Sequence, residues 1–304
     1  MPRRLHWPPA APAQYGWPDD PDLDMGPVEL RQVLVIASTP RVASNFFDAA
    51  LAATGRAGHP LEYLHNGGLV ESRRHTGAPR LTQRGKVQNL KRRLAGDPRW
   101  DFSGELDPTS LVDHLRGIAA RRSTANGVFG VKVHAGHLLG LLDRYGLSVD
   151  LWGVPVRWVR LRRRDRLAQA VSLAVAHQTQ QWRPVERQRG EPTYDLSATR
   201  AAMAEIEAWE SVWDRRLGER SEPKVSFWSE DLVVDPTGAV DRTLALLGEV
   251  PVPGAGVPPV EQYRHPDRVM RQRWIERAME ESPDLAERRF ALGGATVTGN
   301  DAGG

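Results

Sequence analysis

The chain has 304 residues, a formal net charge of +3 and no cysteine, and 40% of its residues are hydrophobic and 26% charged. These proportions are typical of a globular protein, and the lack of cysteine excludes a disulfide framework, a thiolate nucleophile and a cysteine-ligated zinc site. No apolar run approaches the ~20 residues of a membrane span, and Met1 to Met25 lack the apolar stretch of a signal peptide, so we expect a cytoplasmic protein.

One domain accounts for most of the chain. Residues 1–30 are rich in proline and polar groups and predict an extended N-terminal arm. Residues 31–292 predict a single domain, in which the basic, polar segment of about 71–123 forms a helical insertion or lid. The small, polar residues 293–304 predict a flexible tail.

A strand, loop and helix recur along the domain. The apolar run Val33 to Ala37 predicts a strand buried on both faces, followed by a helix that opens near Ala43 and closes at Thr54-Gly55. Further strands are expected over 128–133, 156–161 and 224–228, and further helices over about 136–145, 165–180 and 197–217 and from about 236. This order predicts an α/β fold with three layers, α/β/α, around a central, mainly parallel sheet. Ligands bind such sheets at the carboxyl ends of the strands, which singles out the loops 38–45, 132–137 and 162–165.

The loop after the first strand has the features of a phosphate cradle. Its residues, Ser38 to Asn45, are mostly small, so that backbone N–H groups and the following helix N-terminus can face an anion. We therefore expect cofactor binding by Pro40, Arg41, Val42, Ala43, Ser44 and Asn45. The Walker lysine and its adjacent hydroxyl are missing, which argues against an NTPase. A plain strand-to-helix turn capped by Ser44 is the alternative.

The third loop carries the basic residues Arg162 to Arg164 and leads into a helix that contains Ser172. An arginine fork can pair with two phosphate oxygens, and a serine hydroxyl can donate a further hydrogen bond. The alternative is that Arg162 to Arg164 form a solvated charge run and that Ser172 is an ordinary helical residue.

Both loops resemble those of sulfotransferases that use 3′-phosphoadenosine 5′-phosphosulfate (PAPS), especially the bacterial family typified by trehalose 2-sulfotransferase. That family has Arg-Ser-Gly-Ser-Thr after its first strand, where this chain has Arg-Val-Ala-Ser-Asn at 41–45, so that Val42, Ala43 and Asn45 depart from the pattern. Its Arg-Pro-Asp and Ser-Gln-Ala-Val-Ser resemble 163–165 and 168–172. The resemblance runs from about Val33 to Met279 and includes Thr54 to Glu62, Gln178-Thr179 with Trp182, Tyr194, and Glu230 to Leu232.

The resemblance implies a P-loop-like sulfotransferase fold and an enzyme that moves a sulfuryl group from PAPS to a hydroxyl, with PAP as product and no metal. The acceptor is then a small carbohydrate, a glycolipid or a hydroxylated metabolite. Arg163 and Ser172 are implied to grip the 3′-phosphate, and Arg41 to stabilise the leaving phosphate. Lys132, at the end of the second strand, is expected beside the transferring group.

Two residues compete for the role of catalytic base. Glu62 corresponds to the proposed base of the trehalose-type family, whereas Lys132-Val133-His134 resembles the Lys-Thr-His of cytosolic small-molecule sulfotransferases, whose histidine is the base. An imidazole is well suited to accept a hydroxyl proton. We prefer Glu62 narrowly. The acceptor-binding residues are expected to be Arg56, His59, Glu62, Gln178 and Trp182.

Two other classes of function remain as alternatives. A P-loop-like small-molecule kinase would need the absent Walker lysine, and a basic nucleic-acid-binding module would need a recognition helix, zinc or aromatic platform that the chain lacks. We therefore expect a small-molecule partner, no nucleic acid and no membrane span. A homodimer is compatible with the sequence.

Overall fold

The computed structural model describes residues 23–65, 83–84, 105–184, 186–253, 255–263 and 267–290. Most of the predicted N-terminal arm, much of the predicted insertion and all of the predicted tail lie outside these residues. Within the described part of the chain, no helix combines the length and the apolar character needed to cross a membrane.

Four parallel strands form the central sheet in the order β4-β1-β5-β6. They are β1 (Gln32–Ser38), β4 (Val128–His134), β5 (Val156–Arg162) and β6 (Lys224–Trp228). The central position of β1 explains its continuous apolar run, because neighbouring layers cover both of its faces. The prediction of a central, parallel sheet is confirmed.

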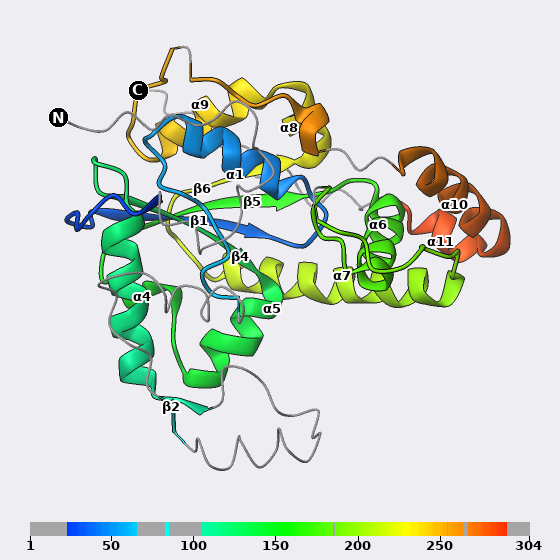
Figure 1. The fold of residues 1–304 in the computed structure, drawn as a ribbon, viewed down its shortest axis with the longest axis horizontal. Helices are drawn as coiled ribbons and strands as arrows, with labels where there is room; N and C mark the ends of the chain where they lie inside the picture. The colour runs from blue at the N-terminus through cyan, green and yellow to red at the C-terminus, as the bar shows by residue number, and fades with distance from the viewer. Residues whose placement is uncertain are drawn as a thin grey trace.

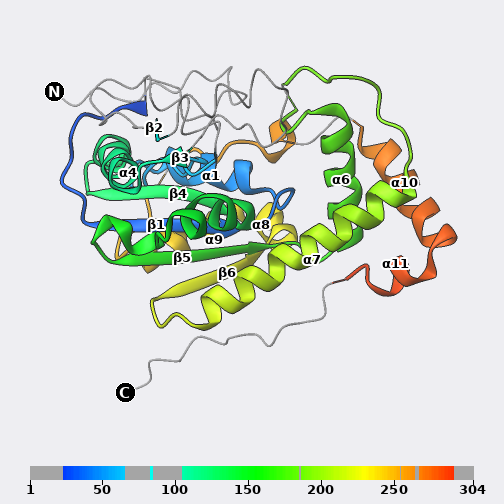
Figure 2. The same cartoon turned by 90° about the horizontal axis from the view of Figure 1, so that it is seen from below.

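Helices cover both faces of this sheet (Figures 1 and 2). On one face, α1 (Ser44–Ala53), α8 (Ser229–Val234) and α9 (Pro236–Leu246) share an apolar cluster with the sheet. On the other face, α4 (Pro108–Arg122) and α7 (Leu196–Gly218) contribute to a second cluster. These clusters establish the predicted three layers.

A third apolar cluster lies beyond the carboxyl end of β5. It joins α7 to α6 (Arg166–Thr179), α10 (Arg268–Glu281) and α11 (Pro283–Glu287). Figure 1 shows α6, α10 and α11 together at this end of the sheet. The remaining elements are a two-stranded antiparallel pair, β2 (Gln83–Arg84) and β3 (Glu105–Leu106), and 3₁₀ turns over Val149–Trp152 and Val260–Tyr263.

Two helical segments differ from the prediction. The helix expected over 136–145 is α5 (Ala135–His137), then a π-helical turn (Leu138–Leu142) and a 3₁₀ turn (Asp143–Tyr145), stopped by Gly146 at φ +63°. The leucines at 138, 141 and 142 are buried, so apolar spacing alone could not separate these helical types. The short α8 was not predicted, because six residues are too few to show a helical period.

The segment that carries Glu62 is packed tightly against β4. Leu61 forms a parallel bridge with Val131, and the amide of Lys132 donates to the Leu61 carbonyl at 2.9 Å. Gly58 has φ +70°, and a Cβ there would lie 2.1 Å from the amide nitrogen of Gly130. Only glycine permits this approach, which carries the chain along β4 and brings Glu62 beside Lys132.

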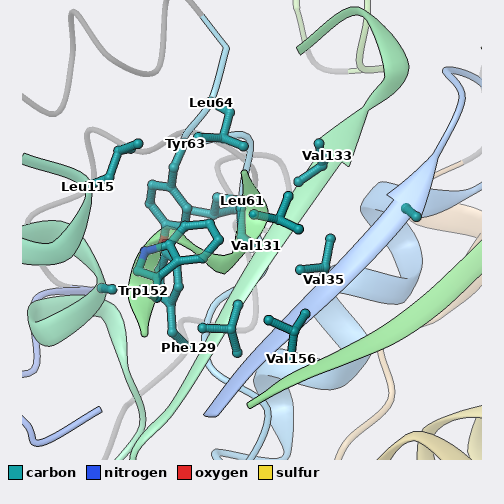
Figure 3. Packing of buried hydrophobic residues seen from close by; sticks show 14 of the residues in the cluster. Val35, Leu61, Tyr63, Leu64, Leu115, Phe129, Val131, Val133, Trp152 and Val156 are labelled. Carbon is teal, nitrogen blue, oxygen red and sulfur yellow. The ribbon is translucent and has the colours of Figure 1, made fainter. Parts of the chain in front are cut away.

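Aromatic side chains complete the anchorage of this segment. Figure 3 shows the rings of Tyr63, Phe129 and Trp152 packed beside Val35 and Val131. The Tyr63 and Phe129 ring centroids are 5.2 Å apart, and those of Phe129 and Trp152 are 5.6 Å apart. Burial of these large rings therefore stabilises the chain immediately after Glu62.

Candidate active site

A cavity of about 620 Å³ opens at the carboxyl ends of β1 and β5. It lies between the start of α1, the β5–α6 loop, α6 and α10. Its lining includes six of the residues expected from the sequence to bind the cofactor: Arg41, Ala43, Ser44, Asn45, Arg163 and Ser172. It also includes Trp182, which was expected to bind the acceptor. The parallel sheet thus brings the first and third loops together at one site.

The first loop has an unusual backbone. Arg41 has φ +69° and Ala43 has φ +60°, both in the left-handed region that non-glycine residues seldom adopt. The helix begins at Ser44, and Ala43 at the N-cap offers no side-chain hydrogen bond. The alternative of a turn capped by Ser44 is therefore not what forms. The first turn of α1 carries no acidic residue and faces the cavity, where its N–H groups and positive dipole end favour an anion.

Three guanidinium groups gather in this cavity. Ser172 Oγ accepts hydrogen bonds from Arg41 Nε at 2.9 Å and from Arg271 Nη1 at 2.6 Å, while Arg163 Nη1 donates to the Arg41 carbonyl at 3.2 Å. Burial, and then the charges of Arg271 and Arg163, lower the pKa of Arg41 to about 9. Burial likewise lowers the pKa of Arg163. An anion bound among these groups would relieve their mutual repulsion.

The sequence reasoning missed Arg271 and its neighbour Arg268, which both line the cavity from α10. Asp267 orients Arg271 through contacts of 2.9 Å to Nε and Nη2. The sequence signal that could have identified them is the spacing of two arginines one helical turn apart, which places two positive charges on the same face of a helix. Nothing local to α10, however, indicates that it packs against α6, some 100 residues earlier in the chain.

The loop that carries Arg163 is fixed on two sides. Glu230 accepts hydrogen bonds from the backbone amides of Arg164 and Asp165, both at 3.1 Å. Asp165 caps α6 through the amide of Ala168 and forms an ion pair of 2.7 Å with Arg289. The Arg163 side chain consequently extends from a backbone with little freedom.

A second cluster of charges lies beside the cavity. Lys132 Nζ is 2.8 Å from Asp48 Oδ2 and 3.2 Å from Glu62 Oε1, and it also donates to Asn45 Oδ1. These three oxygens match the three donors of an ammonium group. Burial by itself would lower the pKa of Lys132, but Asp48 and then Glu62 outweigh it and raise that pKa, so the lysine is charged. Because Asn45 also lines the cavity, it joins the two sites.

Asp48 was not singled out from the sequence. It is buried on α1, and burial raises its pKa to about 6 against the opposing charge of Lys132. A lone aspartate inside an otherwise apolar helix face was the available signal, since buried carboxylates need a partner.

The two candidate bases are neighbours. Glu62 Oε1 lies 3.5 Å from His134 Nε2, and Glu62 Oε2 lies 3.8 Å from His137 Nε2. His134 Nδ1 is 3.1 Å from Ser38 Oγ, at the end of β1. Burial alone would raise the pKa of Glu62, but Lys132 and then His134 hold that pKa well below its ordinary value. Glu62 is thus an ionised carboxylate, and 29% of its side chain is exposed.

The other expected acceptor residues are scattered. The Trp182 carbonyl accepts from Arg41 Nη1 at 2.6 Å, and Gln178 Oε1 accepts from the amide of Thr193 at 3.0 Å. Arg56 forms an ion pair with Glu249 near the start of β4, at the amino ends of the strands and thus at the end of the sheet away from the cavity. The cavity therefore includes Trp182 but neither Arg56 nor His59. Nor do Pro40 and Val42 line it: the Pro40 carbonyl accepts from Gln169, and the Val42 side chain is part of the core.

His59 is buried, with 2% of its surface exposed, and neither ring nitrogen has a hydrogen-bond partner among the described residues. Burial, and then the charge of Arg122, lower its pKa from 6.5 to about 4. The unfolded chain therefore binds more protons at this residue, so stability is lost as pH falls from 6.5 towards 4. The full effect is about 3 kcal/mol.

We expect His59→Gln to flatten the dependence of the unfolding free energy on pH over this range, as measured by urea unfolding at a series of pH values. The wild type, measured over the same series of pH values, provides the reference slope. An unaltered slope in the His59 variant would contradict the expectation.

No group of three or more histidine, aspartate or glutamate side chains within the described ranges is arranged to hold a metal ion.

Several solved structures are similar to this chain. The sulfotransferase domain from the curacin biosynthetic pathway is 16% identical, with 78% of this chain and 79% of that chain covered and a TM-score of 0.43. The sulfotransferase domain of the Synechococcus PCC 7002 olefin synthase is 16% identical, with 88% and 91% covered and a TM-score of 0.44. Retinol dehydratase in complex with androsterone and inactive cofactor PAP is 14% identical, with 86% and 71% covered and a TM-score of 0.39.

No curated protein sequence matches the chain. Among family models, that of the Stf0 sulphotransferases matches residues 33–281, a span that includes both clusters and most of the described chain.

Proposed function

Because the chain belongs to the Stf0 sulphotransferase family and is therefore a sulfotransferase, we propose that its cavity binds PAPS. We further propose that the acceptor is a hydroxyl group of a small carbohydrate, a glycolipid or a hydroxylated metabolite. One observation carries the proposal. A single cavity is lined by a helix N-terminus without a side-chain cap, by Arg41 and Arg271, which both donate to Ser172, and by Arg163. Two anion sites in one cavity suit a nucleotide with phosphate groups at both ends.

Each anion site has a distinct role in the proposal. The loop 40–45 and the first turn of α1 bind the 5′-phosphosulfate through backbone N–H groups. Arg163, Ser172 and Arg271 bind the 3′-phosphate, with Arg271 taking a share that the sequence reasoning did not assign. Arg41 extends between the two sites, where its charge can act on the leaving phosphate.

The chemistry is an in-line displacement at sulfur. The acceptor oxygen forms a bond to sulfur as the bond from sulfur to the bridging phosphate oxygen breaks, and PAP leaves with that oxygen. Glu62 takes the proton of the acceptor hydroxyl, and Lys132 holds the carboxylate in place. The low pKa of Glu62 is compatible with this role, because a loose transition state releases the proton late and a weak base suffices.

Lys132 has a second role in the proposal. All three of its donors are engaged, but Asn45 is a neutral partner that also lines the cavity. When donor is bound, Lys132 exchanges Asn45 for an equatorial oxygen of the sulfuryl group and neutralises part of its charge. Asp48 and Glu62 keep the ammonium in place during this exchange.

Labelled PAPS tests the proposed function directly. The panel of acceptors contains sugars, glycosides and hydroxylated metabolites, with trehalose included because the segment Thr54 to Glu62 resembles that of the trehalose-type family. Transfer of label to any hydroxyl compound is expected. A larger thermal shift with ATP and magnesium than with PAP would favour a kinase instead.

Recognition of the 3′-phosphate gives a sharper prediction. We expect PAP to raise the melting temperature more than ADP does. Arg163→Ala should weaken PAP binding by about 10- to 100-fold and remove most of the preference for PAP over ADP, because a charge-assisted hydrogen bond to the phosphate is lost. Arg164→Ala is the matched control, because the neighbouring Arg164 is half-exposed, pairs with Asp231 and does not line the cavity. An equal loss of PAP affinity in both variants would contradict a specific phosphate site at Arg163.

A further inference from the structure

A buried carboxylate on α7 joins three parts of the structure. Glu210 is 5% exposed and accepts hydrogen bonds from Arg160 Nη2 at 2.7 Å and Arg162 Nε at 3.0 Å, both on β5. It also accepts from Thr39 Oγ1 at 3.1 Å, in the loop after β1. Two cations already neutralise Glu210, so the bond from Thr39 is not needed to satisfy its charge.

Thr39 is the point at which this network reaches the phosphate-binding loop. Its side chain is buried, and its hydroxyl also accepts from Gln169 Nε2 at 2.9 Å. The same amide nitrogen of Gln169 donates to the Pro40 carbonyl at 2.7 Å. The loop is therefore fastened to α7 and to α6 one and two residues before Arg41.

The same helix holds the residue before Thr39 as well. Trp213 lies one turn after Glu210 on α7, and its indole N–H donates to the Ser38 carbonyl at 2.9 Å. The two consecutive residues Ser38 and Thr39 are thus bound to one rigid element. The position of the start of the loop is therefore set by hydrogen bonds to α7.

The backbone of the next residues in the loop requires such support. Arg41 and Ala43 have φ values of +69° and +60°, which cost energy for residues with a Cβ. Such a conformation persists only where the surrounding structure over-determines it. Neither residue is a glycine that would adopt it freely, so the constraint has to come from contacts such as those of Thr39.

We propose that Glu210 is a positioning residue of this enzyme: through Thr39 it holds the left-handed turn that directs Arg41 and the first turn of α1 into the cavity. The inference rests on the proposed use of PAPS for its kinetic consequence, but the hold on the loop is a property of the protein alone. Glu210 and Thr39 do not line the cavity, so their effect on the reaction is transmitted through Arg41.

The cleanest test removes only the hydroxyl. Thr39→Val keeps the shape and leaves Glu210 with both arginines and Gln169 with the Pro40 carbonyl, so the fold should survive. We expect KM for PAPS to rise and kcat to fall, with kcat/KM about 10- to 100-fold lower, as for a small misplacement of reacting groups. Thr39→Ser restores the hydroxyl and should regain most of this loss.

Two further variants locate the effect. Glu210→Gln weakens the acceptor of the same hydrogen bond and should act in the same direction as Thr39→Val. Asp214→Asn is the matched control: Asp214 lies one turn away on α7 and contacts Arg162 at 3.4 Å, but it does not reach the loop. This variant should have wild-type kinetics.

Hydrogen exchange separates this proposal from the proposed function. Without any nucleotide, amides of 38–45 should exchange faster in Thr39→Val than in the wild type, Thr39→Ser or Asp214→Asn. If the loop is equally protected in all four proteins, or if Thr39→Ser is as impaired as Thr39→Val, the positioning role is wrong. If the wild type binds no PAP, the proposed function fails while the exchange data still decide the role of Glu210.

Discussion

Replacing Glu62 with glutamine should lower kcat for sulfuryl transfer by about 10²- to 10⁴-fold, the usual contribution of a general base, while PAP binds as in the wild type. The amide keeps the size and planarity of the side chain but cannot take up a proton. Lys132 remains paired with Asp48 and Asn45, so the fold around the site should be preserved. Steady-state kinetics with labelled PAPS and a separate PAP titration measure the two quantities.

The pH dependence of the wild type supplies an independent check. The pKa of Glu62 lies well below 4.5, so the carboxylate stays ionised and activity should persist as pH falls, until pH reaches that low pKa and the base is protonated. A histidine base would instead lose activity over the range in which imidazole groups ordinarily titrate, near 6.5. Circular dichroism at each pH separates loss of the base from acid unfolding.

His134→Ala completes the comparison. With Glu62 as the base, this variant should lose less activity than Glu62→Gln, because His134 then only contacts the carboxylate, at 3.5 Å, and does not take up the proton. The reverse order would identify His134 as the base. Near-normal turnover in both variants, with intact PAP binding, would show that neither residue has this role.

Replacing Arg41 with alanine should lower kcat by about 10²- to 10³-fold and weaken PAP binding, because the side chain is proposed to stabilise charge on the leaving phosphate. Its pKa of about 9 leaves it charged at neutral pH despite burial and two neighbouring arginines. The replacement also removes one of the two arginine donors to Ser172 Oγ and leaves Arg271 as the other. Kinetics and PAP titration again provide the measurement.

Arg41→Lys and Arg200→Ala are the companion variants. Lysine keeps the charge but not the fork that reaches both Ser172 and the Trp182 carbonyl, so it should recover only part of the lost activity. Arg200 is exposed on α7 and pairs with Asp284, so its replacement should leave kinetics unchanged. Wild-type kcat in Arg41→Ala would overturn the role proposed for this residue.

Much of the architecture was predictable because the strands are local signals. The strands predicted at 33–37, 128–133, 156–161 and 224–228 each match an observed strand to within a residue at either end. β1 and β4 are buried along nearly their whole length between two layers of helices, which explains why their residues are mostly apolar without alternation. The rule that ligands bind at the carboxyl ends of parallel strands then selected three loops, of which 38–45 and 162–165 contribute to the lining of the cavity and 132–137 does not.

The composite helix after β4 and the placement of Arg56 and His59 were not predictable in this way. Arg56, His59 and Glu62 belong to one short motif, yet the chain runs along β4 between them. Arg56 consequently lies near the amino ends of the strands, away from the cavity, and His59, between Arg56 and Glu62 in the chain, is buried. Proximity in sequence did not mean proximity in the site, because an extended segment covers ~3.3 Å per residue.

By itself, the sequence determined the parallel α/β fold and the two strand-end segments, with Arg41, Arg163 and Ser172, that are proposed to bind phosphate, because strand patterns and strand-end loops depend on residues close together in the chain. Only the tertiary structure decided that Arg271 from α10 shares Ser172 with Arg41, that Asp48 and Glu62 both pair with Lys132, and that Glu210 accepts a hydrogen bond from Thr39. The physical reason is that buried charges are stabilised by whichever partners the packing of distant elements brings within hydrogen-bonding distance, and no local pattern encodes that choice.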